Sequence, residues 1–110
     1  MSRFYEMSIK IDGVQKEHIH EIMEICEDEW NFKEWDVYKN KENNTVVLSS
    51  YGQGSLCGGE AEEEFAYRLT ETIWTKLGYF VNIRIGTTYL EAAPFEEYTF
   101  TKEDYDEQNI

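Results

Sequence analysis

Alternation of apolar and polar side chains marks the first element of the chain. Every second residue from Tyr5 to Ile11 is apolar, and the residues between them, including Glu6 and Lys10, are polar. A repeat of two is typical of a strand with one face on a core and the other in water. The same alternation returns over residues 79–85, and we expect a second half-buried strand there, with a bend or bulge at Gly86.

Two segments instead have the repeat of an amphipathic helix. Apolar residues follow the i, i+3, i+4 spacing over residues 15–29 and recur every four residues over residues 60–77. We expect Gly59 to be the N-cap of the second helix and Gly78 to end it, as glycine does after many helices. The two stripes predict the helical part of the core: Ile19, Ile22, Met23, Cys26 and Trp30, then Ala61, Phe65, Leu69, Ile73 and Leu77.

The middle and the end of the chain predict further strands. Residues 32–38 and 45–51 flank a polar turn and read as a hairpin, with Trp35 and Val37 pointing inward. After Pro94, residues 98–100 predict a short edge strand. Residues 101–104 have the pattern of a capping box, so a turn of helix is expected to follow.

The resulting order is strand, helix, strand, strand, helix, strand. It predicts an α+β protein with the ferredoxin-like split βαβ sandwich, an antiparallel sheet with two helices on one face. A chain of 110 residues is one domain. We expect this domain to cover residues 1–102 and residues 103–110 to form an acidic C-terminal tail. That fold hosts many functions and does not by itself indicate one.

Charge excludes several classes of partner. Ten basic residues against 23 acidic ones give a formal net charge of −13. Nucleic acids and anionic membranes are bound through Lys and Arg, so we expect neither as a direct partner. The same charge steers basic proteins toward the surface.

Several absences in the sequence favour the cytoplasm. No apolar run approaches the roughly 18 residues of a membrane span, and there is no signal peptide pattern. The two cysteines form no disulfide framework, so we expect a cytoplasmic protein.

The glycine-rich stretch 52–59 has the composition of a phosphate-binding loop, but it runs directly into glutamates. Four glutamates would repel a phosphate from the following helix N-terminus, namely Glu60, Glu62, Glu63 and Glu64. The glycine spacing also misses the dinucleotide fingerprint by one residue. We therefore predict that these glycines let a strand turn into a helix.

No set of residues predicts catalysis or metal binding. Cys57 precedes a helix, where a thiol pKa can fall, but the nearby carboxylates favour the neutral thiol. His18 and His20 point away from each other on a helix and cannot chelate one metal. We predict no catalytic residue, no cofactor and no metal.

Aromatic residues indicate more about function than the acidic residues do. Phe, Trp and Tyr make up 15% of the chain, which is more than a small core can easily bury. Aromatic side chains beside acidic ones suit protein interfaces. We expect contacts with a partner at two places, the glycine-rich stretch with the start of the second helix, and residues 89–98. The candidate contact residues are Tyr51, Gly52, Cys57, Gly58, Gly59, Glu60, Glu63, Glu64, Tyr89, Glu91, Phe95 and Tyr98.

The C-terminal half also carries a resemblance. The segments that carry it are Ser50-Tyr51-Gly52, Leu56-Cys57-Gly58-Gly59-Glu60, Glu63-Glu64-Phe65, Trp74, Thr88-Tyr89-Leu90-Glu91 and Pro94. This pattern resembles a group of short acidic proteins carried by phages, plasmids and genomic islands of Gram-negative bacteria. The resemblance implies a mobile-element context and a bacterial cytoplasm, and it carries over no functional residue.

Three hypotheses follow from the sequence. The first is a non-enzymatic, acidic protein-binding module, an accessory or host-modulating factor of a mobile element, with a basic protein partner. The second is a mimic of nucleic acid that inhibits a DNA- or RNA-binding protein. The third is a small ligand-binding domain or enzyme that uses the glycine-rich stretch. A homodimer through a sheet face or an edge strand is compatible with all three.

Overall fold

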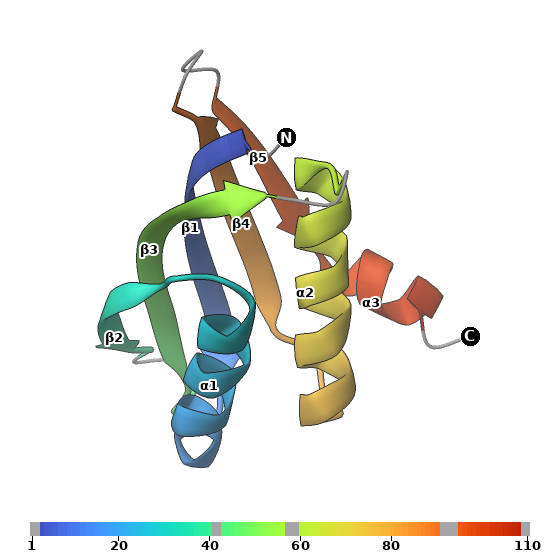
Figure 1. Cartoon of the computed structure of the whole chain (residues 1–110). Helices are drawn as coiled ribbons and strands as arrows, with labels where there is room; N and C mark the ends of the chain where they lie inside the picture. The colour runs from blue at the N-terminus through green and yellow to red at the C-terminus, as the bar shows by residue number, and fades with distance from the viewer. Residues whose placement is uncertain (1–2, 41–42, 57–59, 91–94, 109–110) are drawn as a thin grey trace.

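The chain is built around one antiparallel sheet. The computed structural model describes residues 3–40, 43–56, 60–90 and 95–108, and within them five strands pair in the order β2-β3-β1-β4-β5. Each neighbouring pair is antiparallel. With three α-helices beside this sheet, the protein has the predicted α+β class (Figure 1).

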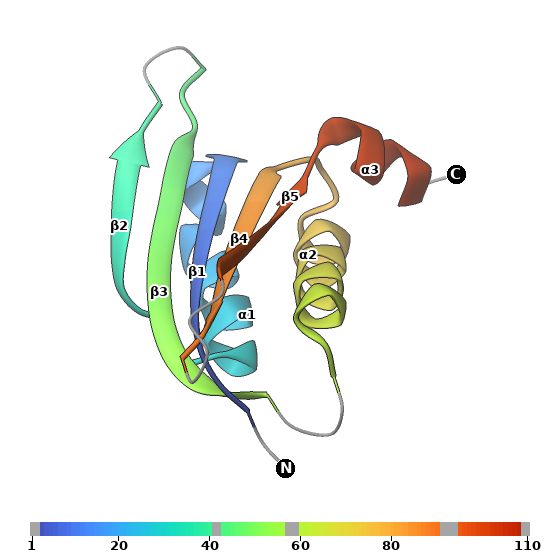
Figure 2. The same cartoon turned by 90° about the horizontal axis from the view of Figure 1, so that it is seen from above.

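The helices lie on one side of this sheet. Figure 2 shows α1 and α2 against the same face, so the opposite face is left to solvent. In chain order the elements are β1 (Arg3–Val14), the 3₁₀ turn η1 (Lys16–His18), α1 (Ile19–Glu29), β2 (Lys33–Lys39), β3 (Val46–Leu56), α2 (Glu62–Leu77), β4 (Asn82–Tyr89), β5 (Phe95–Phe100) and α3 (Lys102–Gln108).

The core lies between the covered sheet face and the two longer helices. Alternation in β1 places four side chains there, all of them buried as predicted: Tyr5, Met7, Ile9 and Ile11. Burying one such aliphatic side chain stabilises the fold by roughly 1.5–3 kcal/mol. The helix stripes meet them with Ile22 and Cys26 from α1 and with Phe65, Leu69 and Ile73 from α2.

Val37 faces the helix-covered side of the sheet, as predicted, because it pairs with the buried Leu48. Its side chain is nevertheless 46% exposed, because β2 is an edge strand. Trp35 is half-buried and its indole N–H donates to Glu27 of α1 at 2.9 Å. The predicted hairpin itself is confirmed by the pairing of β2 with β3.

The glycine-rich stretch is not a loop as far as it is described. Strand β3 continues through Gly52 and Gly54 to Leu56, paired with β1. A Cβ atom on Gly52 would lie 1.8 Å from the carbonyl oxygen of Asn31. The indole of Trp30 covers Gly54 and its N–H donates to the Gly52 carbonyl at 2.9 Å. These two glycines therefore let the end of α1 pack against β3, and the predicted strand-to-helix turn is wrong for them.

The predicted bend at Gly86 is also absent, since β1 and β4 pair without a shift of register from Tyr5 to Asp12. A Cβ on Gly86 would lie 2.7 Å from Ser8 Oγ and 2.9 Å from Cε1 of Phe95. The glycine thus leaves room for the aromatic ring that crosses it from β5.

The structure confirms the glycine predicted to end α2, but not the residue predicted to be its N-cap. Gly78 ends the helix in the left-handed conformation with φ 75°, as predicted. The N-cap residue is Ala61, whose N–H donates to the Glu64 carboxylate at 3.2 Å. The prediction of Gly59 as the N-cap is therefore wrong, because α2 begins later in the chain. Gly59 itself lies outside the described residues.

Residues 95–108 add an edge strand and a helix to the domain. The predicted edge strand is β5, and Asp104 caps α3 by accepting from the Thr101 N–H at 2.9 Å and from its hydroxyl at 3.1 Å. Tyr105 of α3 packs edge-on against Trp74, with ring centroids 5.3 Å apart. The segment expected to be an acidic tail is therefore helical and packed against α2 as far as α3 is described.

Candidate functional site

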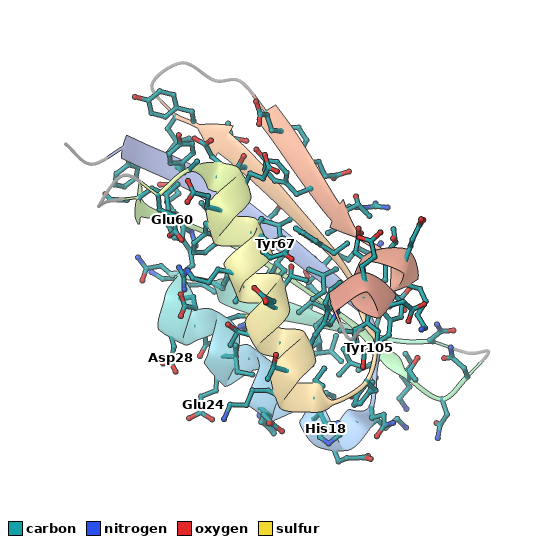
Figure 3. All side chains as sticks on the ribbon, turned by 90° about the vertical axis from the view of Figure 1, so that its right-hand side faces the viewer. His18, Glu24, Asp28, Glu60, Tyr67 and Tyr105 are labelled. Atoms are coloured by element: carbon teal, nitrogen blue, oxygen red, sulfur yellow. The ribbon has the colours of Figure 1, made fainter. Side chains whose placement is uncertain are left out.

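A groove runs between α2 and β5 and is closed at one end by α3. Its volume is about 390 Å³. The α2 residues that line it follow the helical repeat and so share one stripe: Glu63, Tyr67, Thr70, Glu71 and Trp74. Residues 97–100 of β5 form the opposite wall, and Asp104 of α3 stands at the end. Figure 3 looks onto this side of the molecule, with Tyr67 on α2 and Tyr105 on α3.

Aromatic rings form much of the groove wall. Tyr67 is 55% exposed and meets Phe100 edge-on at 6.3 Å between ring centroids. Phe100 in turn meets Trp74 at 6.4 Å. Trp74 is held in place from behind, since its indole N–H donates to the Val81 carbonyl at 2.9 Å. The ring of Trp74 is thus supported by the protein, and more than half of the Tyr67 surface is open to solvent.

Carboxylates stand along the same groove. Glu63 and Glu71 are exposed on α2, and within the described part of the chain neither forms an ion pair. Glu97 on β5 has Arg84 at 3.7 Å, a long contact between two exposed side chains. Exposed pairs of this kind contribute little, about 0–1 kcal/mol. The groove therefore keeps a net negative charge.

A buried hydroxyl lies in the groove wall without a hydrogen bond. Thr70 is 1% exposed, and its Oγ1 has no partner. A helical threonine can donate to the carbonyl four residues earlier, as Thr72 does to Arg68 at 2.9 Å. An unpaired buried hydroxyl costs about 1–3 kcal/mol by mutational measures. Thr70 is thus a polar group that a ligand in the groove could satisfy.

The Tyr98 phenol lies in the groove wall beside several carboxylates. Burial raises the pKa of its phenol well above the ordinary value, and the Glu96 carboxylate, which accepts from the phenol at 2.5 Å, raises that pKa further. Glu62 and Glu63 of α2 act on it in the same direction. These carboxylates add to the negative charge around the groove.

The structure places the predicted contact residues in several different locations. Glu63 and Tyr98 meet in the groove. Tyr51 and Phe95 are 52% and 61% exposed on the uncovered sheet face, whereas Gly52 is buried. Tyr89 stacks on Tyr5 with ring centroids 5.0 Å apart. Cys57, Gly58, Gly59 and Glu91 lie outside the described residues.

Glu60 and Glu64 have structural partners. Arg68 binds Glu60 through two hydrogen bonds, at 2.9 and 3.2 Å, and it also binds Glu29 at the end of α1. These carboxylates raise the pKa of the Arg68 guanidinium above its ordinary value. Glu64 caps the first turn of α2. Both glutamates therefore help to fix α2, while Glu63 on the neighbouring face is left for the groove.

Other reactive groups have ordinary structural roles. Burial raises the pKa of the Cys26 thiol to about 12, which disfavours the reactive thiolate. His18 Nδ1 lies 2.8 Å from the Tyr79 hydroxyl. Among the described residues, no group of three or more His, Cys, Asp and Glu is placed to hold a metal ion.

The helices of the described residues were also compared with the dimensions of a membrane. None of them is long and apolar enough to cross one.

Sequence reasoning missed most of the groove. The candidate contacts predicted from the sequence did not include these groove residues: Tyr67, Thr70, Glu71, Phe100 and Asp104. The sequence signal that could have indicated the groove is the width of the apolar stripe of α2, because Trp74 and Tyr67 extend it beyond the core positions.

In comparisons with known proteins, no family model, no curated protein and no solved structure matches the chain.

Proposed function

We propose that the chain is a non-enzymatic, acidic protein-binding module whose partner is a basic protein segment seated in the groove between α2 and β5. The observation that carries this proposal is the grouping of Glu63, Glu71 and the exposed Tyr67 along one groove. Carboxylates attract Lys and Arg, and an aromatic ring binds their cationic groups through its face. Rigid aromatic side chains are also enriched at the centre of protein interfaces.

The net charge of −13 supports the same class of partner. Such a field speeds the encounter with a basic protein at low salt and weakens contact with nucleic acid and anionic membranes. A binding module needs no catalytic residue, cofactor or metal, and we propose none.

We propose that the architecture is the ferredoxin-like sandwich with β5 and α3 added after it. The order of the first six elements, β1-α1-β2-β3-α2-β4, and the sheet order β2-β3-β1-β4 support this assignment. In this view the added edge strand and helix are what create the groove beside α2.

The biological setting is proposed from the sequence resemblance alone. It is an accessory or host-modulating role for a mobile element in the bacterial cytoplasm. A basic host protein would fit both this setting and the charge of the groove.

A mimic of nucleic acid remains the second candidate. Glu60, Glu63, Glu64 and Glu71 line a further open hollow of about 550 Å³ on the adjoining face of α2, so carboxylates continue along the helix. In this case the partner would be a DNA- or RNA-binding protein, and the binding surface would extend beyond the groove.

A salt-dependent pull-down tests the proposal. The wild-type chain, a Glu63→Gln/Glu71→Gln variant and a control Glu21→Gln/Glu24→Gln variant are immobilised and exposed to bacterial lysate at low and then high salt. Glu24 lies on α1 away from the groove (Figure 3), and both changes remove two exposed carboxylates. We expect a basic protein that wild type and control retain and the groove variant loses.

The proposal fails if groove and control variants retain the same proteins. Retention of several nucleic-acid-binding proteins, all released at high salt and all lost equally from both variants, would favour the nucleic-acid mimic instead.

A further inference from the structure

Strand β5 is an edge strand of the sheet and lines the groove. The sheet order ends at β5, so in the described part of the chain no strand pairs with its second side. Its six residues pair with β4 without a shift of register. An edge of this kind presents a row of backbone N–H and C=O groups over roughly 20 Å, and it can template a further strand.

The opposite edge of the sheet is protected. Strand β2 shifts register against β3 between Lys33 and Asp36, and Glu34 there has the positive φ of 55°. The Ser50 hydroxyl donates to the Lys33 carbonyl at 2.6 Å and so fixes this irregularity. Bulges of this type keep an edge from pairing. The regular edge at β5 is therefore the one open to strand addition.

Charge decides which strand fits beside β5. Glu96 and Glu97 lie on the strand itself, and Glu63 and Glu71 face it across the groove. A second copy of this chain would bring its own net charge of −13 and the same glutamates. A segment rich in Lys and Arg instead pairs with these carboxylates.

We propose that an extended basic segment of a partner protein binds by adding to β5 as a sixth strand, with one Lys or Arg side chain entering the groove toward the Thr70 hydroxyl. This inference rests on the proposed function and specifies how the partner binds. Backbone hydrogen bonds to β5 give affinity for an extended chain, and alternate side chains give specificity.

The groove supplies a partner for each part of the entering cation. Glu63 and Glu71 provide charge at the entrance, and the face of Tyr67 accepts a cation–π contact. Such a contact already exists nearby, where the Lys102 ammonium lies 5.3 Å from the Tyr105 ring centroid. The unpaired Oγ1 of Thr70 can accept a hydrogen bond from an ammonium or guanidinium N–H.

The test uses a synthetic peptide of about eight residues in which Lys alternates with Thr, a typical strand length. Two further versions carry N-methyl groups on one or the other set of alternate backbone nitrogens, which removes donors while keeping the charge. Affinity is measured by fluorescence anisotropy, and amide exchange is followed by NMR on the labelled protein. We expect one N-methylated version to bind at least about tenfold more weakly, a loss of roughly 1.4 kcal/mol. We also expect the parent peptide to slow exchange of β5 amides.

Thr70→Val tests separately whether the Thr70 hydroxyl in the groove wall binds the peptide, since the change keeps the side-chain shape and removes the hydroxyl. We expect roughly three- to tenfold weaker binding of the parent peptide, the size of one net hydrogen bond. Circular dichroism of the variant confirms that it is folded.

Different outcomes overturn different parts. If all three peptides bind equally and β5 amides gain no protection, strand addition is wrong while the basic-partner function stands. If the free protein is a dimer with protected β5 amides, a second copy occupies the edge and the inference fails. If no peptide binds, or if Glu63→Gln/Glu71→Gln binds as wild type does, the proposed function itself is overturned.

Discussion

At the scale of single residues, Thr70 is the position where stability and binding are expected to conflict. Its hydroxyl is buried in the wall of the groove and has no partner, so it costs stability in the free protein. A core chosen only for stability would carry an apolar side chain of the same shape there. In the proposed mode of binding, this hydroxyl accepts a hydrogen bond from the ligand.

Thr70→Val is expected to raise the free energy of unfolding by about 1 kcal/mol, because it removes an unpaired buried hydroxyl. Urea unfolding followed by fluorescence measures this change. Thr72→Val is the matched control, since the Thr72 hydroxyl is bonded to Arg68 and its loss should not stabilise. An equal gain from both variants would contradict the assignment of Thr70 as unpaired.

The backbone at Asn31 lies so close to position 52 that only glycine fits there. Gly52→Ala is expected to lower the free energy of unfolding by roughly 3 kcal/mol, at the upper end for overpacking, because its Cβ would collide with the Asn31 carbonyl. Gly13→Ala is the control, with no atom near the new Cβ and a cost of about 1–2 kcal/mol from its positive φ alone. A Gly52→Ala variant as stable as the control in urea would show that this packing is looser than described.

The Cys26 thiol predicts a pH dependence. Burial, with help from Glu27 and Glu29, raises its pKa from 9.0 to about 12. A pKa that is higher in the folded than in the unfolded chain stabilises below pH 9, and this contribution is lost as pH rises from 9 toward 12.

We therefore expect the stability advantage of wild type over Cys26→Ala to shrink between about pH 8 and about pH 10.5. Urea unfolding of both proteins at each pH measures it, and the comparison cancels other titrating groups. An advantage that stays constant over this range would contradict a thiol held neutral by burial.

At the scale of elements, α3 supports the end of the groove. Tyr105 packs against Trp74 and Phe80, with ring centroids 5.3 and 5.8 Å away. Trp74 in turn contacts Phe100 of β5. The seven-residue helix thus joins the edge strand to α2 and helps to set the distance between the groove walls.

Tyr105→Ala is expected to lower the free energy of unfolding by roughly 1.5–3 kcal/mol, since it removes a half-buried ring from this cluster. Asp106→Ala is the control on the exposed side of the same helix, where loss of the Lys102 pair should change stability by no more than about 0.5 kcal/mol. Thermal unfolding compares the two. If they cost the same, α3 does not stabilise the groove wall.

The sequence predicts helices and strands well where a regular apolar repeat faces the single core of the protein. Alternation in β1 and the stripes of α1 and α2 identify buried residues such as Ile9, Ile22 and Leu69. It fails where tertiary contacts override local signals. Gly52 and Gly54 look like loop residues because the backbone and indole that pack on them come from residues 30 and 31, distant in the sequence.

The candidate site shows the same limit. Glu63 and Tyr98 could be named from composition, but their meeting across the groove depends on the sheet order that places β5 beside α2. Thr70 could not be predicted as unpaired, since Thr72 of the same helix donates to the Arg68 carbonyl.

At the scale of the whole molecule, the charge and the open edge act together. A net charge of −13 repels further copies of the chain and attracts basic proteins over a range set by ionic strength. The edge at β5 would be an aggregation hazard without its glutamates. In the proposed mode of binding, the same glutamates favour basic strands as partners of this edge.

The most direct test of this account is the affinity of the alternating Lys–Thr peptide for three proteins, measured by fluorescence anisotropy at low salt. These are wild type, Glu63→Gln/Glu71→Gln in the groove and Glu21→Gln/Glu24→Gln on α1, which have matched changes in charge. The account predicts at least about tenfold weaker binding to the groove variant and no more than about twofold weaker binding to the control. Equal weakening in both variants would show that the peptide responds only to net charge, and the groove would then not be the binding site.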